Sequence, residues 1–341
     1  MSRSFCLVVN PAAAGGRCGR RLPETLGALA ADGTAVRVCQ TTGLGDAARL
    51  AEQATGRGET VVAVGGDGLV GALASAVSRA GGVLGIIPGG RGNDFAHMLG
   101  IPASPAAAVA ALLGGGPRAV DLIGVQAGDG AELVVAGSVY LGIPSEGGEL
   151  ANRSWWARGP AGYQLAGVCA LLGWRPATFT VDPGTAGRGA ASFPGFCVVV
   201  ANSVYLAAGR KVAPDADIGD GLLDVIMVSQ GRKLSFVEAM LRAGRGTHVR
   251  MEQVSTQRAA SVTVTADRAM PAAADGETLA CARPLAAGSP LRIRALPGAL
   301  RVIAPASRPA TAPAPLPAGA DVVAVAPAVP VTEGPSGSGA G

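Results

Sequence analysis

The sequence has little of what most metal sites and nucleic-acid surfaces are built from. It contains two histidines, and its six cysteines are scattered without a Cys-x-x-Cys pair, so a zinc site is not expected. We expect reduced cysteines that serve as small apolar residues. Aromatic residues make up 4% of the chain and the net charge is only +4. The composition therefore indicates neither a base-stacking surface nor a basic field for nucleic acid.

Long apolar runs and targeting patterns are lacking as well. Met1-Ser2-Arg3-Ser4 leads directly into a short apolar run, which is not the pattern of a signal peptide. A membrane-spanning helix takes about 20 consecutive apolar residues, and the best run, Cys197 to Ala208, is interrupted by Asn202. The sequence therefore predicts a soluble, cytoplasmic protein, for which any work on lipid would be peripheral, at the membrane surface.

Two common phosphate-handling motifs are absent. The chain has no Gly-x-x-x-x-Gly-Lys-Ser/Thr P-loop, no Asp-Phe-Gly and no catalytic loop of the protein-kinase type. A phosphoryl-transfer enzyme would still need groups that hold phosphate, a magnesium ion and a base for the acceptor hydroxyl.

Two apolar runs that end in glycines carry the main signal. Val61–Val64 leads into Gly65-Gly66-Asp67-Gly68, and Leu84–Ile87 leads into Pro88-Gly89-Gly90. Each run predicts a buried parallel strand, and the apolar spacing after Gly68 predicts a helix. Amides at such a helix N-terminus suit phosphate. Because Asp67 would repel phosphate unless a divalent cation lay between them, a magnesium-nucleotide is indicated.

The same residues allow an alternative. Gly66-Asp67-Gly68-Leu69-Val70-Gly71 matches the Gly-x-Gly-x-x-Gly fingerprint of dinucleotide-binding proteins. That fingerprint normally follows the first strand, whereas here it follows the third predicted strand, and no acidic residue closes the next one. An NAD-binding dehydrogenase is therefore the less favoured alternative.

Five motifs, in order, resemble the diacylglycerol kinase catalytic-domain family, which includes bacterial soluble lipid kinases and sphingosine kinases. They are Asn10–Gly16, Gly65–Gly68, Pro88–Ala96, Ala213–Asp224 and Ala274–Glu277. The resemblance implies ATP-dependent phosphorylation of a lipid hydroxyl, most directly of diacylglycerol to phosphatidic acid, or of a related lipid or sphingoid base. A catalytically decayed nucleotide-binding protein of the same fold is the other alternative.

The resemblance also implies roles for particular residues. Asp275 matches the family's proton acceptor, and its magnesium ligands match Asp217, Asp220 and the carbonyl of Leu222, a more structural than catalytic site. Contacts to ATP fall on Asn10, Pro11, Ala12, Ala13, Ala14, Thr41, Gly66, Asp67, Gly68, Leu69, Val70, Gly71, Ala72 and Arg91.

The residue types by themselves leave other interpretations open. Thr41 could cap a helix, Asp275-Gly276 could be a turn, and the aspartates from Asp215 to Asp224 could form an exposed acidic loop. Asn93 or Asp94 is expected to cap a helix.

Three positions depart from the family pattern. Leu69 and Arg91 replace threonines, and Ala72 replaces a glutamate. We expect the Arg91 guanidinium to fork onto phosphate oxygens, against the alternative of an exposed loop charge without a role.

The element order predicts two domains and a tail. Residues 1–124 alternate strand and helix, which predicts an α/β doubly wound domain, by resemblance NAD-kinase/phosphofructokinase-like. Residues 125–305 are strand-rich and predict a β-sandwich-like domain. The resemblance implies that this domain binds lipid and metal and that its last strands return to the first domain. Residues 306–341 hold seven prolines and no aromatic residue, so a disordered tail is expected.

The expected partner is a lipid substrate at the membrane surface, with no nucleic acid, and a homodimer is left open. Arg153, Trp155, Trp156 and Arg158 interleave basic and aromatic side chains. They are either membrane-interface anchors or ordinary packing residues.

Overall fold

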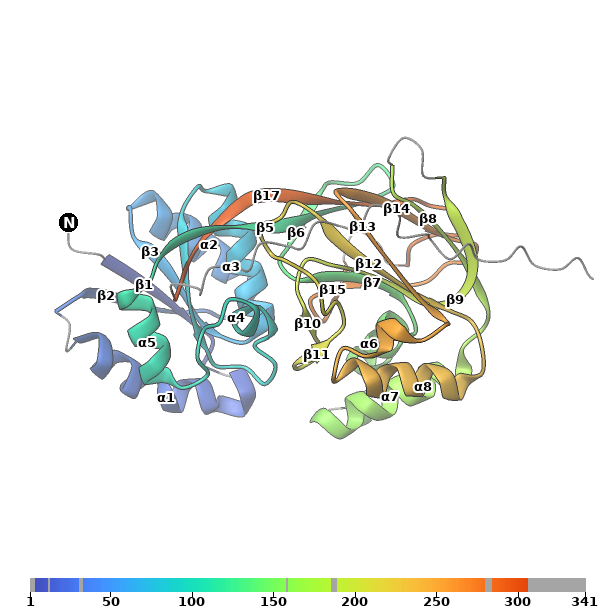
Figure 1. Cartoon of the computed structure of the whole chain (residues 1–341). Coiled ribbons are helices and arrows are strands. Elements are labelled where there is room, and N and C mark those ends of the chain that lie inside the picture. Colours follow the sequence, from blue (N-terminus) through green and yellow to red (C-terminus); the bar gives the residue numbers. More distant parts are fainter. Residues whose placement is uncertain are drawn as a thin grey trace, which may run out of the picture. The chain divides into compact units, whose positions relative to one another are not determined.

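The computed structural model describes residues 4–11, 13–30, 33–157, 159–184, 189–279 and 284–305. The predicted tail, residues 306–341, lies outside them. The first part of the chain alternates strands and helices (Figure 1). Its elements are β1 (Ser4–Val9), α1 (Ala13–Ala30), β2 (Ala35–Gln40), α2 (Leu44–Gly56), β3 (Thr60–Gly65), α3 (Asp67–Arg79), β4 (Val83–Pro88), α4 (Asp94–Met98) and α5 (Pro105–Gly114).

The first four strands form a parallel sheet in the order β2-β1-β3-β4. Their apolar runs are continuous because helices cover both faces of a doubly wound sheet. Phe5 to Val9 and Val61 to Val64 are all buried. Parallel neighbours need crossover connections, which α1, α2 and α3 provide. The C-terminal ends of all four strands therefore lie at one edge of the sheet.

The second part is strand-rich and antiparallel. Its elements are β5 (Gly116–Ala127), β6 (Leu133–Val135), β7 (Ser138–Gly142), α6 (Ile143–Arg153), the 3₁₀ turn η1 (Trp155–Ala157), α7 (Gly159–Gly173), β8 (Ala177–Asp182), β9 (Ala191–Ala201), β10 (Tyr205–Leu206), β11 (Arg210–Lys211), β12 (Leu223–Ser229), α8 (Lys233–Ala243), η2 (His248–Arg250), β13 (Val254–Ala259), β14 (Ser261–Ala266), β15 (Ala272–Ala274), β16 (Glu277–Thr278) and β17 (Leu291–Ala304). Strand β9 pairs with β8 through its first half and with both β7 and β12 through its second half.

Two long strands, β5 and β17, join the two parts. They pair in an antiparallel ladder from Gly116–Ala304 to Ala127–Leu291. The end of β17 also pairs in parallel with β4, whereas its start pairs with β14 of the second part. The last strand thus returns to the N-terminal sheet, as the family resemblance implies.

Asp121 stabilises the irregular part of this ladder, where the register changes between Leu296 and Leu300. Its side chain is buried, with Oδ1 accepting a hydrogen bond of 2.7 Å from the Gly298 N–H. Oδ2 accepts one of 2.7 Å from the Gly221 N–H, in the loop before β12. One carboxylate therefore satisfies backbone donors of two segments that are far apart in sequence.

Some elements differ in extent from the sequence-based prediction. The sequence around Leu22–Ala31 predicts a helix, but α1 already begins at Ala13, because Gly15 and Gly16 are typical helix breakers and conceal its first half. The sequence from Ala119 to Ile123 predicts a short strand, which is the middle of the longer β5. Tertiary pairing extends both β5 and β17 beyond what local sequence indicates.

Asp121→Ala is expected to lower the free energy of unfolding by about 3 kcal/mol, because the N–H groups of Gly221 and Gly298 lose their hydrogen bonds to a buried, charged acceptor. Thermal and denaturant unfolding measure this. Asp129→Ala, at an exposed position just after β5, is the matched control. Equal stability of the two variants would contradict the assignment of Asp121 as a structural fastener.

Candidate active site

Backbone hydrogen bonds align the ends of the four parallel strands. The Thr41 N–H donates to the Val9 carbonyl at 2.9 Å, and the Asn10 N–H donates to the Val64 carbonyl at 3.3 Å. The Gly89 N–H donates to the Gly65 carbonyl at 2.7 Å. The structure thereby brings the predicted nucleotide segments together at one edge, where parallel α/β sheets bind ligands. Ala12 and the side chains of Ala13 and Ala14 lie outside the described residues.

Helix α3 begins at this edge, with Gly66 as its N-cap residue and Asp67 as its first residue. The side chains of Leu69 and Val70 are buried in the core, so only their backbone could face a nucleotide. Gly68, Gly71 and Ala72 are half-buried.

The two glycine turns touch. A Cβ atom on Gly90 would lie 2.5 Å from the Gly66 Cα, so no side chain fits there. Asn93 adopts a left-handed φ of 55°, and its Oδ1 accepts a 2.8 Å hydrogen bond from the Gly90 N–H. Arg91 is exposed in the same loop. Its proposed contact with phosphate stays a prediction.

Asp67 serves the start of α4 as well as the start of α3. Its Oδ2 accepts a 2.7 Å hydrogen bond from the Asn93 N–H, and its Oδ1 accepts one of 3.4 Å from the Phe95 N–H. The prediction that Asn93 or Asp94 caps this helix is right in position, since Asn93 is the N-cap residue, but neither side chain makes the cap bond. The carboxylate from the neighbouring strand end takes that role.

The Asp94 side chain instead reaches the hairpin of β10 and β11. Its oxygens accept hydrogen bonds from the N–H groups of Ala208 at 3.0 Å and Gly209 at 2.7 Å. Close by, His97 of α4 stacks on Tyr205 of β10, with ring centroids 4.0 Å apart. Helix α4 is therefore bonded to the second part of the chain.

Thr41 makes a local turn. Its Oγ1 donates to the Gly43 carbonyl at 2.6 Å and accepts from the Gly43 N–H at 3.2 Å. No side chain caps α2, whose N-cap residue is Gly43. The helix-cap alternative for Thr41 is therefore wrong, and its contact with nucleotide stays a prediction.

Asp275 lies in the turn between β15 and β16 with a left-handed φ of 47°. Its carboxylate accepts hydrogen bonds from three successive N–H groups before and at the start of β7: Ala136 at 2.9 Å, Gly137 at 3.0 Å and Ser138 at 2.8 Å. A Cβ atom on Gly71 would lie only 3.6 Å from its Oδ2. An acid from the second part of the chain thus lies beside Gly71, near the start of α3.

The site carries concentrated negative charge. Burial and the charge of Asp94 raise the pKa of Asp67, opposed by its bonds from N–H groups. Burial likewise raises the pKa of Asp275, and the charge of Asp94 raises it further. The three N–H groups oppose this shift, because they favour the ionised form. None of the ion pairs among the described residues involves these three aspartates. A cation would therefore fit here electrostatically.

The geometry limits how such a cation could bind. Within the described ranges, no group of three or more His, Cys, Asp or Glu side chains is placed to hold a metal ion. Magnesium commonly takes one or two carboxylates and completes its shell with substrate phosphates and water. Asp67 fits a cation of that kind, bound together with a nucleotide.

The predicted magnesium loop contains a competing partner. Asp217 Oδ1 accepts from the Gly219 N–H at 3.0 Å, and Asp220 Oδ1 accepts from the Leu222 N–H at 3.0 Å. The other oxygen of Asp220 forms an ion pair with Arg258 of β13. The oxygen chemistry suits magnesium, but a guanidinium already neutralises Asp220. The ligand set of Asp217, Asp220 and Leu222 stays a prediction.

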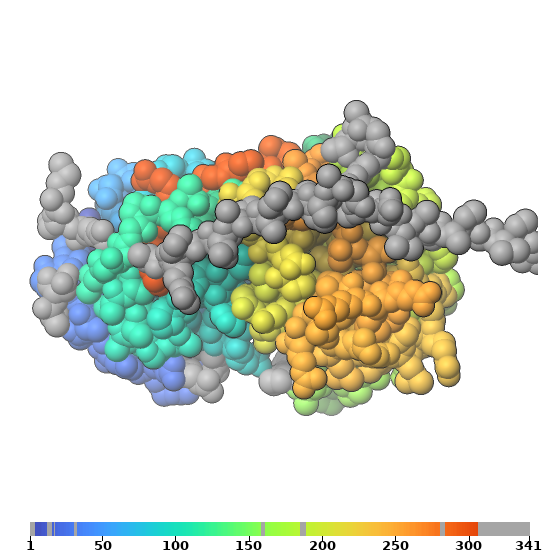
Figure 2. Space-filling model, in the orientation of Figure 1, coloured from blue at the N-terminus to red at the C-terminus, as the bar shows by residue number. Residues whose placement is uncertain are grey.

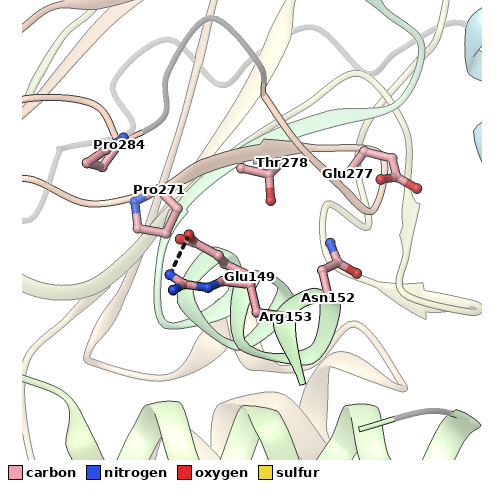
Figure 3. A pocket seen from close by; sticks show the side chains of 7 residues that line it. All are labelled: Glu149, Asn152, Arg153, Pro271, Glu277, Thr278 and Pro284. Atoms are coloured by element: carbon pink, nitrogen blue, oxygen red, sulfur yellow. Dashed lines mark ion pairs between the residues drawn. The ribbon is translucent and has the colours of Figure 1, made fainter. Parts of the chain in front are cut away.

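A pocket of about 380 Å³ is lined in part by residues that closely follow Asp275 in the sequence (Figure 3). Glu277 and Thr278, which follow Asp275, line one side of it. On the other side lies α6, with an ion pair of 3.6 Å between Glu149 and Arg153.

Comparison with known proteins decides the family. A family model described as the diacylglycerol kinase catalytic domain matches residues 4–125. The YegS C-terminal NAD kinase beta sandwich-like domain matches residues 137–304. A diacylglycerol kinase of Mycobacterium tuberculosis is 33% identical over 267 residues, which cover 76% of this chain and 82% of that protein. The chain belongs to the diacylglycerol kinase family. It is a lipid kinase.

Other relatives agree with this family. A YegS-like lipid kinase of Stenotrophomonas maltophilia is 28% identical over 315 residues, which cover 89% of this chain and 96% of that protein. A solved diacylglycerol kinase structure from Bacillus anthracis covers 89% of this chain and 97% of its own, with a TM-score of 0.65 at 19% identity, and supports the fold. The predicted family and fold class are confirmed, and the dehydrogenase and decayed-protein alternatives are set aside.

The structure also adds residues that sequence reasoning missed. The amides of Ala136, Gly137 and Ser138 hold Asp275, and Arg258 holds Asp220. Every residue except proline has a backbone N–H group, so residue type does not reveal which amides hold a carboxylate. Positions 258 and 220 are far apart in the sequence, so no local pattern connects them.

None of the described helices is both long enough and apolar enough to cross a membrane.

Arg258→Gln is expected to make thermal stability depend more strongly on magnesium, because it removes the positive charge that competes with a cation for Asp220. Melting temperatures of the parent and the variant, each with magnesium and with EDTA, measure this. Arg292→Gln, on β17, is a control for the loss of one arginine. A variant no more sensitive to magnesium than the parent would argue against a cation site in this loop.

Proposed function

We propose that this lipid kinase transfers the γ-phosphoryl group of ATP to the free hydroxyl of diacylglycerol and so forms phosphatidic acid. The observation that carries the proposal is the closeness of Asp275 to Gly71. A base held on one part of the chain lies beside Gly71 of α3, the helix whose N-terminus would hold phosphate. Phosphoryl transfer needs such a base beside a phosphate site.

The nucleotide would lie along the aligned strand ends. The N-terminus of α3 and the glycine turns offer backbone N–H groups for phosphate oxygens. Asp67 would share a magnesium ion with those phosphates, and such an ion lowers the cost of gathering negative charge there. Arg91, exposed at the mouth of the second glycine turn, would add a charged contact.

Asp275 would accept the proton of the lipid hydroxyl as the hydroxyl oxygen bonds to the γ-phosphorus and the bond to the leaving ADP oxygen breaks. The hydrogen bonds to this carboxylate and its burial serve the role in different ways. Three N–H groups orient the carboxylate and keep it ionised, whereas burial makes it a stronger base than an exposed aspartate. Because the ionised form is the base, the rate should fall as the pH drops through a pKa above the ordinary value.

Radiolabelled ATP with vesicles that contain both diacylglycerol and a sphingoid base tests the proposal as a whole. Label in phosphatidic acid, identified by mass, is the expected result. Label only in the phosphorylated sphingoid base would keep the kinase chemistry but replace the acceptor.

Asp275→Asn is expected to lower kcat by about 10²–10⁴-fold and to leave ATP affinity near that of the parent, because it removes basicity while keeping size. Single-turnover transfer and binding of a fluorescent ATP analogue measure the two effects separately. Asp267→Asn, at an exposed position before the same turn, is the control. A matching loss of ATP affinity would make Asp275 a nucleotide-binding residue instead of the base.

Asp67→Asn is expected to lower kcat by about 10²–10³-fold and to weaken the magnesium dependence of ATP binding, because one cation ligand loses its charge. Titration of magnesium at fixed ATP measures the dependence. Asp46→Asn, in the first turn of α2, tests for a general effect of a carboxylate at a helix start. Near-normal turnover with unchanged magnesium dependence would exclude Asp67 from the metal site.

A further inference from the structure

The large exposed apolar side chains of this protein are gathered in one region. Of the eleven in the described part of the chain, nine lie in η1, α7 and α8. The other two, Val38 and Leu44, lie in the N-terminal part. Scattered exposed apolar residues are ordinary, but a concentration of them marks a surface that binds something.

Helix α7 has no charged side, and Gln164 is the one strongly polar residue in its sequence. Its sequence from Gly159 to Gly173 contains no charged residue. One side of it is buried, yet Leu165, Val168 and Leu172 are 52%, 50% and 67% exposed. Their spacing of three and four residues places them in one stripe along the helix. A helix without a polar face is expected to be covered on all sides, by protein or by lipid.

Helix α8 repeats the pattern. Leu234, Val237 and Leu241 have the same spacing and are 71%, 40% and 72% exposed. The Lys233 ammonium donates a 2.5 Å hydrogen bond to the Leu172 carbonyl, so the end of α7 meets the start of α8. Figure 2 shows the orange region that contains α8 at the surface, with the green region that contains α7 below it. We call the exposed apolar side chains of η1, α7 and α8 the apolar face.

Basic residues accompany the apolar face. The segment from residue 231 to residue 251 holds five arginines and lysines and one acidic residue, Glu238. In η1, Trp155 is 81% exposed, and the Arg153 side chain, just before it, is 79% exposed. Because so much of Trp155 is exposed, the alternative that it is an ordinary packing residue is wrong. Arg158 lies outside the described residues. Tryptophan beside arginine is typical of a membrane interface, and a cationic border is attracted to anionic lipid.

The apolar face also connects with the candidate active site. Tyr163 of α7 approaches α6, with its hydroxyl 3.5 Å from the place of a Cβ on Gly148. Although Tyr163 as a whole is 43% exposed, partial burial of its hydroxyl end and the charge of Glu277, two residues after Asp275, raise its pKa. Arg153, which lines the pocket between α6 and Glu277, lies two residues before Trp155 in the sequence. A surface bound to η1 would thus lie close to a residue that lines this pocket.

We infer that the apolar face docks this kinase onto a bilayer that contains anionic phospholipid. The inference rests on the proposed function, because a diacylglycerol substrate resides in such a bilayer. A second copy of the chain is the competing occupant. Two copies would bring their excess of basic residues together, whereas an anionic bilayer neutralises it. The side-chain stripes enter the lipid interface, and the arginines and lysines contact the headgroups.

The test combines one leucine from each helix. Leu165→Glu with Leu241→Glu is expected to weaken binding of the full-length chain to phosphatidylcholine/phosphatidylglycerol vesicles by at least about tenfold. Leu44→Glu, at a leucine 44% exposed on α2, should bind as the parent does. Binding is followed by co-sedimentation, and the unchanged melting temperature of each variant shows that the fold is intact. The parent should bind pure phosphatidylcholine vesicles more weakly.

Activity separates this inference from the proposed function. Transfer to diacylglycerol in vesicles should fall in the double variant, while transfer to a short-chain diacylglycerol in detergent micelles should stay at the parent's rate. Unchanged vesicle binding by the double variant would overturn the inference, and so would a parent dimer that the double variant dissociates without any loss of vesicle binding. No transfer by the parent in either assay would instead refute the proposed function, and vesicle binding would still report on the apolar face.

Discussion

The antiparallel pairing of β5 with β17 is the interaction on which the rest of the structure depends. The two strands run through both parts of the chain, so the parallel sheet and the antiparallel strands share one hydrogen-bonded ladder. Where the ladder shifts register, Asp121 supplies the acceptor that the displaced backbone needs and also holds the loop before β12. The position of the second part relative to the glycine turns follows from that ladder, which makes a site built from both parts possible.

Backbone amides, and not lysines or arginines, support the acidic residues of this site. Asp67 binds the start of α4, Asp94 binds the β10–β11 hairpin, and Asp275 binds the amides before β7. Amides orient a carboxylate without cancelling its charge. The site therefore retains the negative charge that a magnesium-nucleotide would balance, and each carboxylate also ties together segments that are distant in sequence.

The proposed phosphate site and the proposed docking surface lie on different parts of one chain. The glycine turns lie at the strand ends of the parallel sheet, whereas the apolar face lies on helices of the antiparallel part. Asp275 stands between them, next to α3 on one side and two residues before Glu277 on the other. If the two proposals hold, the nucleotide and the lipid would bind to different parts of the chain.

The sequence by itself determined the parallel strands, the helix after Gly68 and the family, because apolar periodicity and glycine turns are local properties. Family motifs also pointed to Asp275. Only the tertiary structure decided that Asp275 lies beside Gly71, that Arg258 pairs with Asp220 and that Asp67 caps α4. It also decided that Leu165 and Leu241 are exposed, since the sequence of an apolar helix does not show whether other parts of the chain cover it. Those facts depend on which distant segments meet, and no local pattern of residues encodes such a meeting.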